Sequence, residues 1–301
     1  MVISSWMHFL TLGEPAWLCG VVMVGGAVCG GRRSRLMSPE SMRVRRLRSV
    51  ALPPWRRSRL GRIRVGLRDG ARTTLHVASY ERDAVNVRVA VLERPTPLVS
   101  WCRAQGVRDA VVGGFFVRSA GMPLGQLRVG GEPRPSEAFE APWCDVRACV
   151  HIDDGVLRIA RRDELVADPG GDLLQAGPLL VAGGQGVVAD GEDSEGFAAA
   201  AHQFDSDITS GRFPRAALAI AGERLLAVAC DGRTQRDAGM TVVELADALM
   251  TLGATDALNL DGGGSASLVH AGRLRNRPRE EHGADLLEGR PIVTAVVFEP
   301  R

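Results

Sequence analysis

The sequence predicts an α+β fold: a mixed, mainly antiparallel sheet core with a few flanking helices. Strand-length apolar runs outnumber helical patterns along the 301 residues, and the alternation in residues 86–91 (NVRVAV) is typical of a half-buried strand. No repeated βα unit and no internal repeat is visible, which argues against a doubly wound parallel sheet. The composition, 45% hydrophobic and 24% charged, is that of a globular protein.

The expected strands are short and are separated by turn residues. In chain order they cover residues 73–80, 84–93, 109–116, 147–152, 156–160, 173–184, 216–220, 225–230 and 256–260. The runs at 216–220 and 225–230 form a hairpin that turns at residues 221–224. Gly113 and Gly114 lie inside the third run, where glycine usually marks a bulge or a close approach of two backbones.

Helical patterns are fewer than strand patterns. Helices are expected over residues 98–105, 194–204 and 241–252. The first would end at Gly106. The third begins with a capping box, Thr241 followed three positions later by Glu244, and Gly253 would stop it.

All 37 basic residues are arginine, because the chain contains no lysine. This excludes mechanisms that depend on a lysine, such as the phosphate-binding P-loop, Schiff-base chemistry and the kinase strand lysine. The formal net charge is +2, but residues 32–68 hold thirteen arginines and one acid, a local net charge of +12. The rest of the chain is therefore acidic.

This charge pattern divides the chain into two parts. Residues 1–72 are expected to form a basic arm that does not fold, because like charges at this density repel one another. An alternative is that the arm is upstream sequence, with Met37 or Met42 as a later start. Residues 73–301 are expected to form the functional domain. The arm could contact nucleic acid, but an aromatic content of 5% gives little surface for stacking on bases, and no nucleic-acid partner is expected.

An uncharged segment, residues 16–31, precedes the arginines. It is shorter than the roughly 20 apolar residues of a spanning helix, and its positive charges follow the apolar run instead of preceding it. Export is therefore not expected and a cytoplasmic location is. A single N-terminal membrane anchor, with the arm held inside, is the alternative.

Six cysteines are present and none forms a C-x-x-C pair, which favours a reducing compartment. Cys144, Cys149 and His151 are close in sequence, but their spacing matches no zinc pattern. We expect neither a metal nor a cofactor.

The strongest local signal is the segment that follows the last expected strand, LNLDGGGSASLV. Asn259 and Asp261 are two positions apart and would point to one face of that strand. Gly262, Gly263 and Gly264 follow and allow backbone N–H groups to converge on an anion such as a phosphate. The alternative is a tight turn in which Asp261 caps the local backbone.

A second polar pair is expected at one end of the hairpin. Arg215 begins its first strand and Asp231 follows its second, so the two residues should lie close together. Arginine presents a planar pair of donors that suits a phosphate or a carboxylate. The alternative is that the two residues form a structural salt bridge.

The ordered series of motifs resembles the phosphodiester glycosidase family from residue 73 to the C-terminus. The matching pieces are VVGGFF (111–116), PLGQL (123–127), QAGPLLV (175–181), FPRAALAI (213–220), VACDGR (228–233), residues 239–269 around DGGGS, and NRP (276–278). Two positions depart from the family pattern: Val112 stands where an Asn is usual, and Phe213 where a His is common.

The resemblance implies a hydrolase that cleaves the glycosidic bond of a sugar 1-phosphodiester of the N-acetylglucosamine type, with a small-molecule or polymeric sugar phosphate as substrate. The residues that it implies in the site are Asp261, Asp231, Arg215, Asn259, Gly262, Gly263, Gly264, Ser265, Asn276, Arg277, Gly113 and Gly114.

The chemistry of this bond leads to the hypothesis that Asp261 activates water or attacks the anomeric carbon. Arg215, Arg277 and the glycine N–H groups hold the phosphate. Asp231 either orients Arg215 or serves as the second carboxylate. The departures at Val112 and Phe213 keep open a non-catalytic module that binds phosphorylated sugars or polysaccharide.

Overall fold

The structure is a computed structural model, and it describes residues 45–47, 58–198 and 208–301. The chain divides into two units, Met1–Ser38 and Pro39–Arg301, and every described residue belongs to the second. The apolar segment at 16–31 and most of the basic arm lie outside the described residues.

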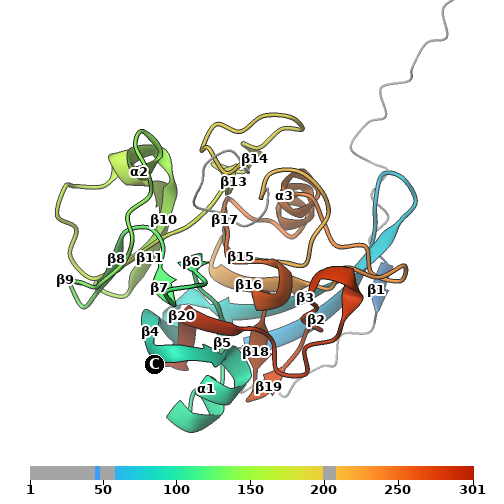
Figure 1. Cartoon of the computed structure of the whole chain (residues 1–301), viewed down its shortest axis with the longest axis horizontal. Helices are drawn as coiled ribbons and strands as arrows, with labels where there is room; N and C mark the ends of the chain where they lie inside the picture. Colours follow the sequence, from blue (N-terminus) through green and yellow to red (C-terminus); the bar gives the residue numbers. More distant parts are fainter. Residues whose placement is uncertain (1–44, 48–57, 199–207) are drawn as a thin grey trace, which may run out of the picture. The chain divides into compact units, whose positions relative to one another are not determined.

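The largest element is an eight-stranded sheet (Figure 1). Its strands are β1 (Arg45–Leu47), β2 (Ser58–Gly66), β3 (Arg72–Glu81), β13 (Leu179–Ala182), β14 (Gln185–Gly186), β15 (Arg215–Ala221), β16 (Arg224–Cys230) and β17 (Asp256–Asn259). Their spatial order is β1-β2-β3-β16-β15-β17-β13-β14. The hairpin predicted from the sequence is confirmed as β15 and β16, and β17 pairs with the other edge of β15.

Two five-stranded sheets accompany the large one. The first contains β8 (Leu127–Val129), β9 (Glu132–Pro133), β10 (Ala148–Asp153), β11 (Val156–Arg161) and β12 (Asp172–Gln175). The second contains β4 (Val85–Pro97), β5 (Ala110–Val112), β18 (Leu268–His270), β19 (Arg273–Leu274) and β20 (Pro291–Pro300). A small hairpin pairs β6 (Phe116–Val117) with β7 (Met122–Pro123). Every pairing between these strands is antiparallel, whereas the sequence predicted a mixed, mainly antiparallel core.

The described residues hold three α-helices: α1 (Leu98–Gln105), α2 (Trp143–Val146) and α3 (Val242–Thr251). Helix α1 ends at Gly106, whose φ of 70° is left-handed and suits glycine. Helix α3 begins with the predicted capping box, in which the Thr241 side chain accepts the Glu244 N–H. With so few helices the molecule is mainly β, a narrower class than the mixed fold expected.

The two faces of the large sheet pack in different ways because strand side chains alternate. Ala216 and Leu218 of β15 belong to a core that also includes Val111 and Val296 of the second five-stranded sheet. Ala217, on the opposite face, belongs to a core closed by α3. Helix α3 contacts β13, β14 and β17, and Figure 1 shows it beside these strands.

The helix expected over residues 194–204 is not formed in its described part, residues 194–198; the remainder lies outside the described residues. Acidic side chains there bind backbone N–H groups instead of facing solvent. Asp193 accepts from Phe197 and Ala198, and buried Glu195 accepts from Leu179. These contacts favour a compact loop over a helix.

The strand expected over residues 109–116 is interrupted after Val112 and resumes at Phe116. At the interruption, a Cβ on Gly113 would lie 2.5–2.9 Å from atoms of Thr294 in β20, so the glycine permits close backbone contact.

The N-terminal boundary also differs from the expectation of an unfolded arm up to residue 72. Strand β2 pairs with β3 along its whole length. Val65 and Leu67 are buried in the core beneath α3, and burial of such side chains offsets the charge repulsion on the same segment.

Among the described residues, no helix combines the length and apolar character needed to cross a bilayer. The same residues contain no group of three or more His, Cys, Asp or Glu side chains arranged to hold a metal ion.

Candidate functional site

The segment Asp261–Ser265, here called the glycine loop, follows β17 and is fixed by backbone hydrogen bonds on both sides. The Asp261 N–H donates to the Gly113 carbonyl at 3.0 Å, and the Gly263 N–H donates to the Pro214 carbonyl at 2.8 Å. The loop is therefore clamped between the interruption after β5 and the start of β15. A Cβ on Gly262 would lie 2.9 Å from the Pro214 carbonyl oxygen, so this clamp has no room for a side chain there.

Asp261 is half-buried, and its Oδ1 accepts the Gly262 N–H at 2.8 Å. Burial raises the pKa of Asp261 to about 6, against the opposing effects of Ser265, the Gly262 N–H and the positive charges of Arg290 and Arg118. A carboxyl group with this pKa exchanges protons near neutral pH, which is the property expected of a general acid or base.

Arginine side chains surround the glycine loop. A Cβ on Gly263 would lie 3.3 Å from Nη2 of Arg233, and one on Gly264 would lie 3.1 Å from Nη2 of Arg290. Arg118 and Arg290 act electrostatically on both Asp261 and Glu280, and Arg233 acts on Glu280. The loop thus lies in a strongly positive environment, which favours an anionic ligand.

Glu280 is the second carboxylate beside the loop, 3.0 Å from the position of a Cβ on Gly264. Arg290 holds it through two hydrogen bonds, Nε to Oε1 at 2.8 Å and Nη2 to Oε2. The Arg290 hydrogen bonds keep the pKa of Glu280 below its usual value, with help from the charges of Arg118 and Arg233. The pKa values of the two carboxyl groups are therefore pushed in opposite directions, a pattern common where two carboxyl groups take different catalytic roles.

Arg233 has a left-handed backbone, with φ of 63°, which non-glycine residues adopt infrequently. Its Nη1 donates to the Arg279 carbonyl at 2.7 Å, and its guanidinium lies over the ring of Phe213, 5.9 Å from the centroid. Strained backbone of this kind often occurs at functional sites. Phe213, where the family commonly has His, here packs against the arginine.

Four predicted site residues lie near the loop and hold its surroundings in place. Gly113 and Gly114 donate their N–H groups to the Thr294 backbone oxygen and hydroxyl, at 2.9 and 3.1 Å. Asn259 donates from Nδ2 to the carbonyls of Gly177 and Leu260, both at 2.9 Å. Asn276 accepts the Leu268 N–H and donates to the Ala266 carbonyl.

Two of the three glycine N–H groups expected to cradle an anion, those of Gly262 and Gly263, already have acceptors within the protein. Gly262 donates to Asp261, Gly263 to Pro214 and Ser265 to the Gly262 carbonyl. The positive charge near the loop comes instead from arginines that the sequence analysis did not select, Arg118, Arg233 and Arg290. The signal for Arg233 was present, because it directly follows Asp231 and Gly232 in one of the matching motifs.

Arg215 and Asp231 are adjacent in backbone position, as predicted, but their side chains have different partners. Arg215 is paired in register with Cys230, so Asp231 is one position further along and faces the other side of the sheet. The buried Arg215 guanidinium donates to the carbonyls of Met240 and Gly211, at 2.6 and 3.1 Å. Asp231 contacts His76 and accepts the Arg277 N–H, so the structure groups Arg277 with Asp231 and away from Arg215.

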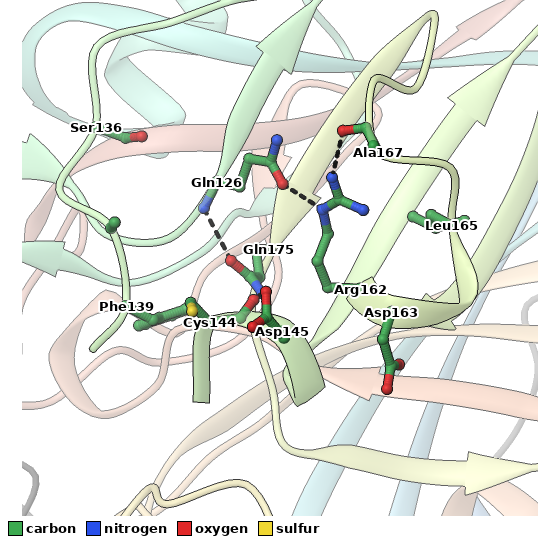
Figure 2. Close-up of a pocket in the computed structure, with 11 residues that line it drawn as sticks. Gln126, Ser136, Phe139, Cys144, Asp145, Arg162, Asp163, Leu165, Ala167 and Gln175 are labelled. Carbon is green, nitrogen blue, oxygen red and sulfur yellow. Dashed lines mark hydrogen bonds between the residues drawn. The ribbon is translucent and has the colours of Figure 1, made fainter. Parts of the chain in front are cut away.

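A separate cavity of about 540 Å³ lies in the region of the first five-stranded sheet (Figure 2). Its lining includes the carboxylates Asp145 and Asp163, and the Arg162 guanidinium is engaged by Gln126 and the Ala167 carbonyl. A lining with this charge disfavours a phosphate group. The arginine cluster at the glycine loop is the better match for an anionic substrate.

The structure is thus a mainly antiparallel β protein in which two carboxylates and an arginine cluster meet at the glycine loop. A family model described as phosphodiester glycosidase matches residues 105–299, more than half of the chain. The chain belongs to the phosphodiester glycosidase family.

Solved structures of other proteins share the fold. The catalytic domain of zebrafish N-acetylglucosamine-1-phosphodiester alpha-N-acetylglucosaminidase, auto-inhibited by its pro-peptide, aligns with a TM-score of 0.62 and 18% identity over 86% of this chain and 88% of that chain. A hypothetical protein from Synechocystis aligns with a TM-score of 0.57 and 18% identity over 84% of this chain, which spans 64% of that protein's length. Comparison with curated protein sequences gives no significant match.

Proposed function

We propose that the protein hydrolyses the glycosidic bond of a sugar 1-phosphodiester, with Asp261 as the residue that activates water. The observation that carries this proposal is the combination at the glycine loop of a carboxyl group with a pKa of about 6 and an arginine cluster. Membership of the phosphodiester glycosidase family and the likeness to the zebrafish catalytic domain support an N-acetylglucosamine type of sugar.

The chemistry of the bond explains why one ionisable carboxyl group suffices. Water attacks the anomeric carbon and gives a proton to Asp261, the bond from that carbon to the phosphate oxygen breaks, and a phosphate monoester leaves with the bond electrons. This leaving group is a weak base, so it needs little help from a general acid. A base for water and positive charge for the departing phosphate are the main requirements.

We assign the phosphate contact to Arg233 and Arg118. Arg233 lies against Gly263, and Arg118 acts on both Asp261 and Glu280. Arg290 is hydrogen-bonded to Glu280, and this contact fixes the positions of both charges beside Gly264. A fixed arrangement of charges costs no reorganisation during the reaction, which is the main source of electrostatic catalysis.

The experiment is a turnover assay with uridine diphosphate N-acetylglucosamine, measuring free N-acetylglucosamine. The parental chain should release the sugar, and Asp261→Asn should not. Asp256→Asn, at the opposite end of β17, is the matched control and should retain the parental rate. Equal turnover by parental and Asp261→Asn proteins would refute the role of Asp261, and binding without turnover in the parental chain would favour the non-catalytic module.

A further inference from the structure

A cavity of about 260 Å³ is built at a different place in the fold from the glycine loop. Its lining is Leu60, Arg62, His76, Asp231, Arg275 and Arg277. These residues come from β2, from β3, from the end of β16 and from the segment after β19. The lining shares no residue with the glycine loop or with its arginine and glutamate neighbours.

The carboxylate in this cavity is fully engaged by the protein. Asp231 Oδ1 accepts the Arg277 backbone N–H at 2.7 Å, and Oδ2 lies 3.1 Å from Nε2 of His76. Burial alone would raise the pKa of Asp231, but the hydrogen bond and charge of His76, the Arg277 N–H and the charge of Arg279 hold it below its usual value. Asp231 therefore stays ionised and contributes one negative charge to the cavity.

The arginines supply three positive charges, which this single negative charge does not balance. Arg275 donates from Nε and Nη2 to the His270 carbonyl, a neutral acceptor. Burial and the neighbouring charge of Arg273 lower the pKa of Arg275. Within the described ranges, the guanidinium groups of Arg62 and Arg277 make no hydrogen bond or ion pair. Both residues are exposed, so two guanidinium groups at the cavity are open to solvent and to a ligand and have no acceptor among the described residues.

We propose that this cavity is a second anion site, which binds a phosphate group. Each guanidinium group offers a pair of N–H donors that matches two oxygens of a phosphate. Two guanidinium groups without a protein acceptor, beside a partly buried arginine, provide more donors than a carboxylate ligand could use. The phosphate could be inorganic phosphate or a phosphate carried by a sugar, and the two sources are distinguished below. The site is independent of the hydrolysis proposed for the glycine loop.

Arg62 completes the site from outside the family-matched residues 105–299. The β2–β3 register places Arg62 directly opposite His76, so both side chains point to one face of the sheet. Arg59, three positions earlier on the same strand, is exposed and points to the opposite face. Arg59 therefore provides a matched control, because it has the same charge on the same strand but lies outside the cavity.

The test is calorimetric titration of the full chain with inorganic phosphate. To remove the contribution of the glycine loop, the background variant is Arg233→Ala. In that background phosphate should still bind with one-to-one stoichiometry. Adding Arg62→Ala or Arg277→Ala should weaken binding about tenfold each, the effect of losing one charge-assisted hydrogen bond. Arg59→Ala should leave binding unchanged, and Arg62→Lys should recover part of it.

Thermal melting of each variant establishes that it folds. Binding of similar strength in the Arg62→Ala, Arg277→Ala and Arg59→Ala variants would overturn the proposal, as would the absence of binding in the Arg233→Ala background. Titration with uridine diphosphate N-acetylglucosamine, with Asp261→Asn added to that background, identifies the source. Tighter, Arg62-dependent binding of the nucleotide sugar indicates a phosphate borne by a sugar, and tighter binding of inorganic phosphate indicates the free ion. Loss of turnover in Asp261→Asn leaves these outcomes unaffected, so the two proposals fail independently.

Discussion

Asp261 and Asp231 follow the two strands that flank β15, yet their carboxyl groups have pKa values displaced in opposite directions. Half-buried Asp261 accepts the Gly262 N–H, and Ser265 and the charges of Arg290 and Arg118 also favour its charged form, yet the effect of burial on its pKa dominates. Asp231 contacts His76 and accepts the Arg277 N–H, and the effect of these partners on its pKa outweighs that of burial. Both carboxylates have hydrogen-bond donors, so the balance between burial and the stabilising donors and charges determines which one exchanges protons near neutral pH and which one remains charged.

The largest expected contrast is in turnover. Asp261→Asn should lower kcat by about 10²–10⁴-fold, the usual contribution of a general base. Asp231→Asn should retain most of the activity, because its partners lie in the other cavity. Steady-state hydrolysis of uridine diphosphate N-acetylglucosamine by both variants measures the difference. A larger loss in Asp231→Asn than in Asp261→Asn would reverse the assignment.

Gly113 and Gly264 are expected to differ in role: Gly113 allows close packing, and Gly264 belongs to the candidate site. A Cβ on Gly113 would lie 2.8 Å from the Thr294 backbone, so Gly113→Ala should cost about 1–3 kcal/mol of unfolding free energy, as overpacking usually does. At Gly264 the nearest atoms are the ends of the Glu280, Arg290 and Leu286 side chains, 3.0–3.1 Å from the position of a Cβ, and these can move. Gly264→Ala should therefore keep its stability and lose activity. Urea unfolding and turnover, measured on both variants, decide whether the two positions differ in this way.

The pH dependence of hydrolysis should follow Asp261. Because Asp261 must be deprotonated to accept a proton from water, kcat/KM should rise with pH and reach half its plateau near pH 6, the raised pKa of this group. Below that pH the rate should fall about tenfold per pH unit. A profile flat between pH 5 and 7 would contradict a water-activating role.

The smallest effect is expected on stability at Asp231. Asn can still accept the Arg277 N–H, so Asp231→Asn should lose about 1 kcal/mol at pH 7. The folded-state pKa is lowered, so this stabilisation is present above the unfolded-state value and is lost as the pH falls through the lower folded-state value. Urea unfolding at pH 7 and in strong acid should show the difference between parental and variant proteins shrinking in acid.

Local patterns in the sequence predicted much of the fold. The capping box at Thr241, the stop at Gly106 and the hairpin turn at residues 221–224 each depend on residues close together in the chain, and all three are confirmed. The failures depend on distant partners. Glu195 was interpreted as part of a helix because its hydrogen-bond donor, the N–H group of Leu179, cannot be identified from local pattern alone.

The site follows the same rule. Ordered motifs identified the glycine loop, but spacing could not show that Arg290 and Glu280 would pair beside Gly264. Nor could it show that Arg215 would point to the carbonyls of Met240 and Gly211, since these contacts depend on how separate loops meet. The roles predicted for the individual site residues remain predictions.

The pairing of β2 and β3 next to β16 has a practical consequence for anyone who shortens this chain to residues 105–299. Such a fragment would lack both strands, and β16 would become an unprotected edge with a free row of backbone donors and acceptors. Edges of that kind recruit other chains, so the fragment should self-associate. Expression of this protein should therefore begin upstream of Ser58.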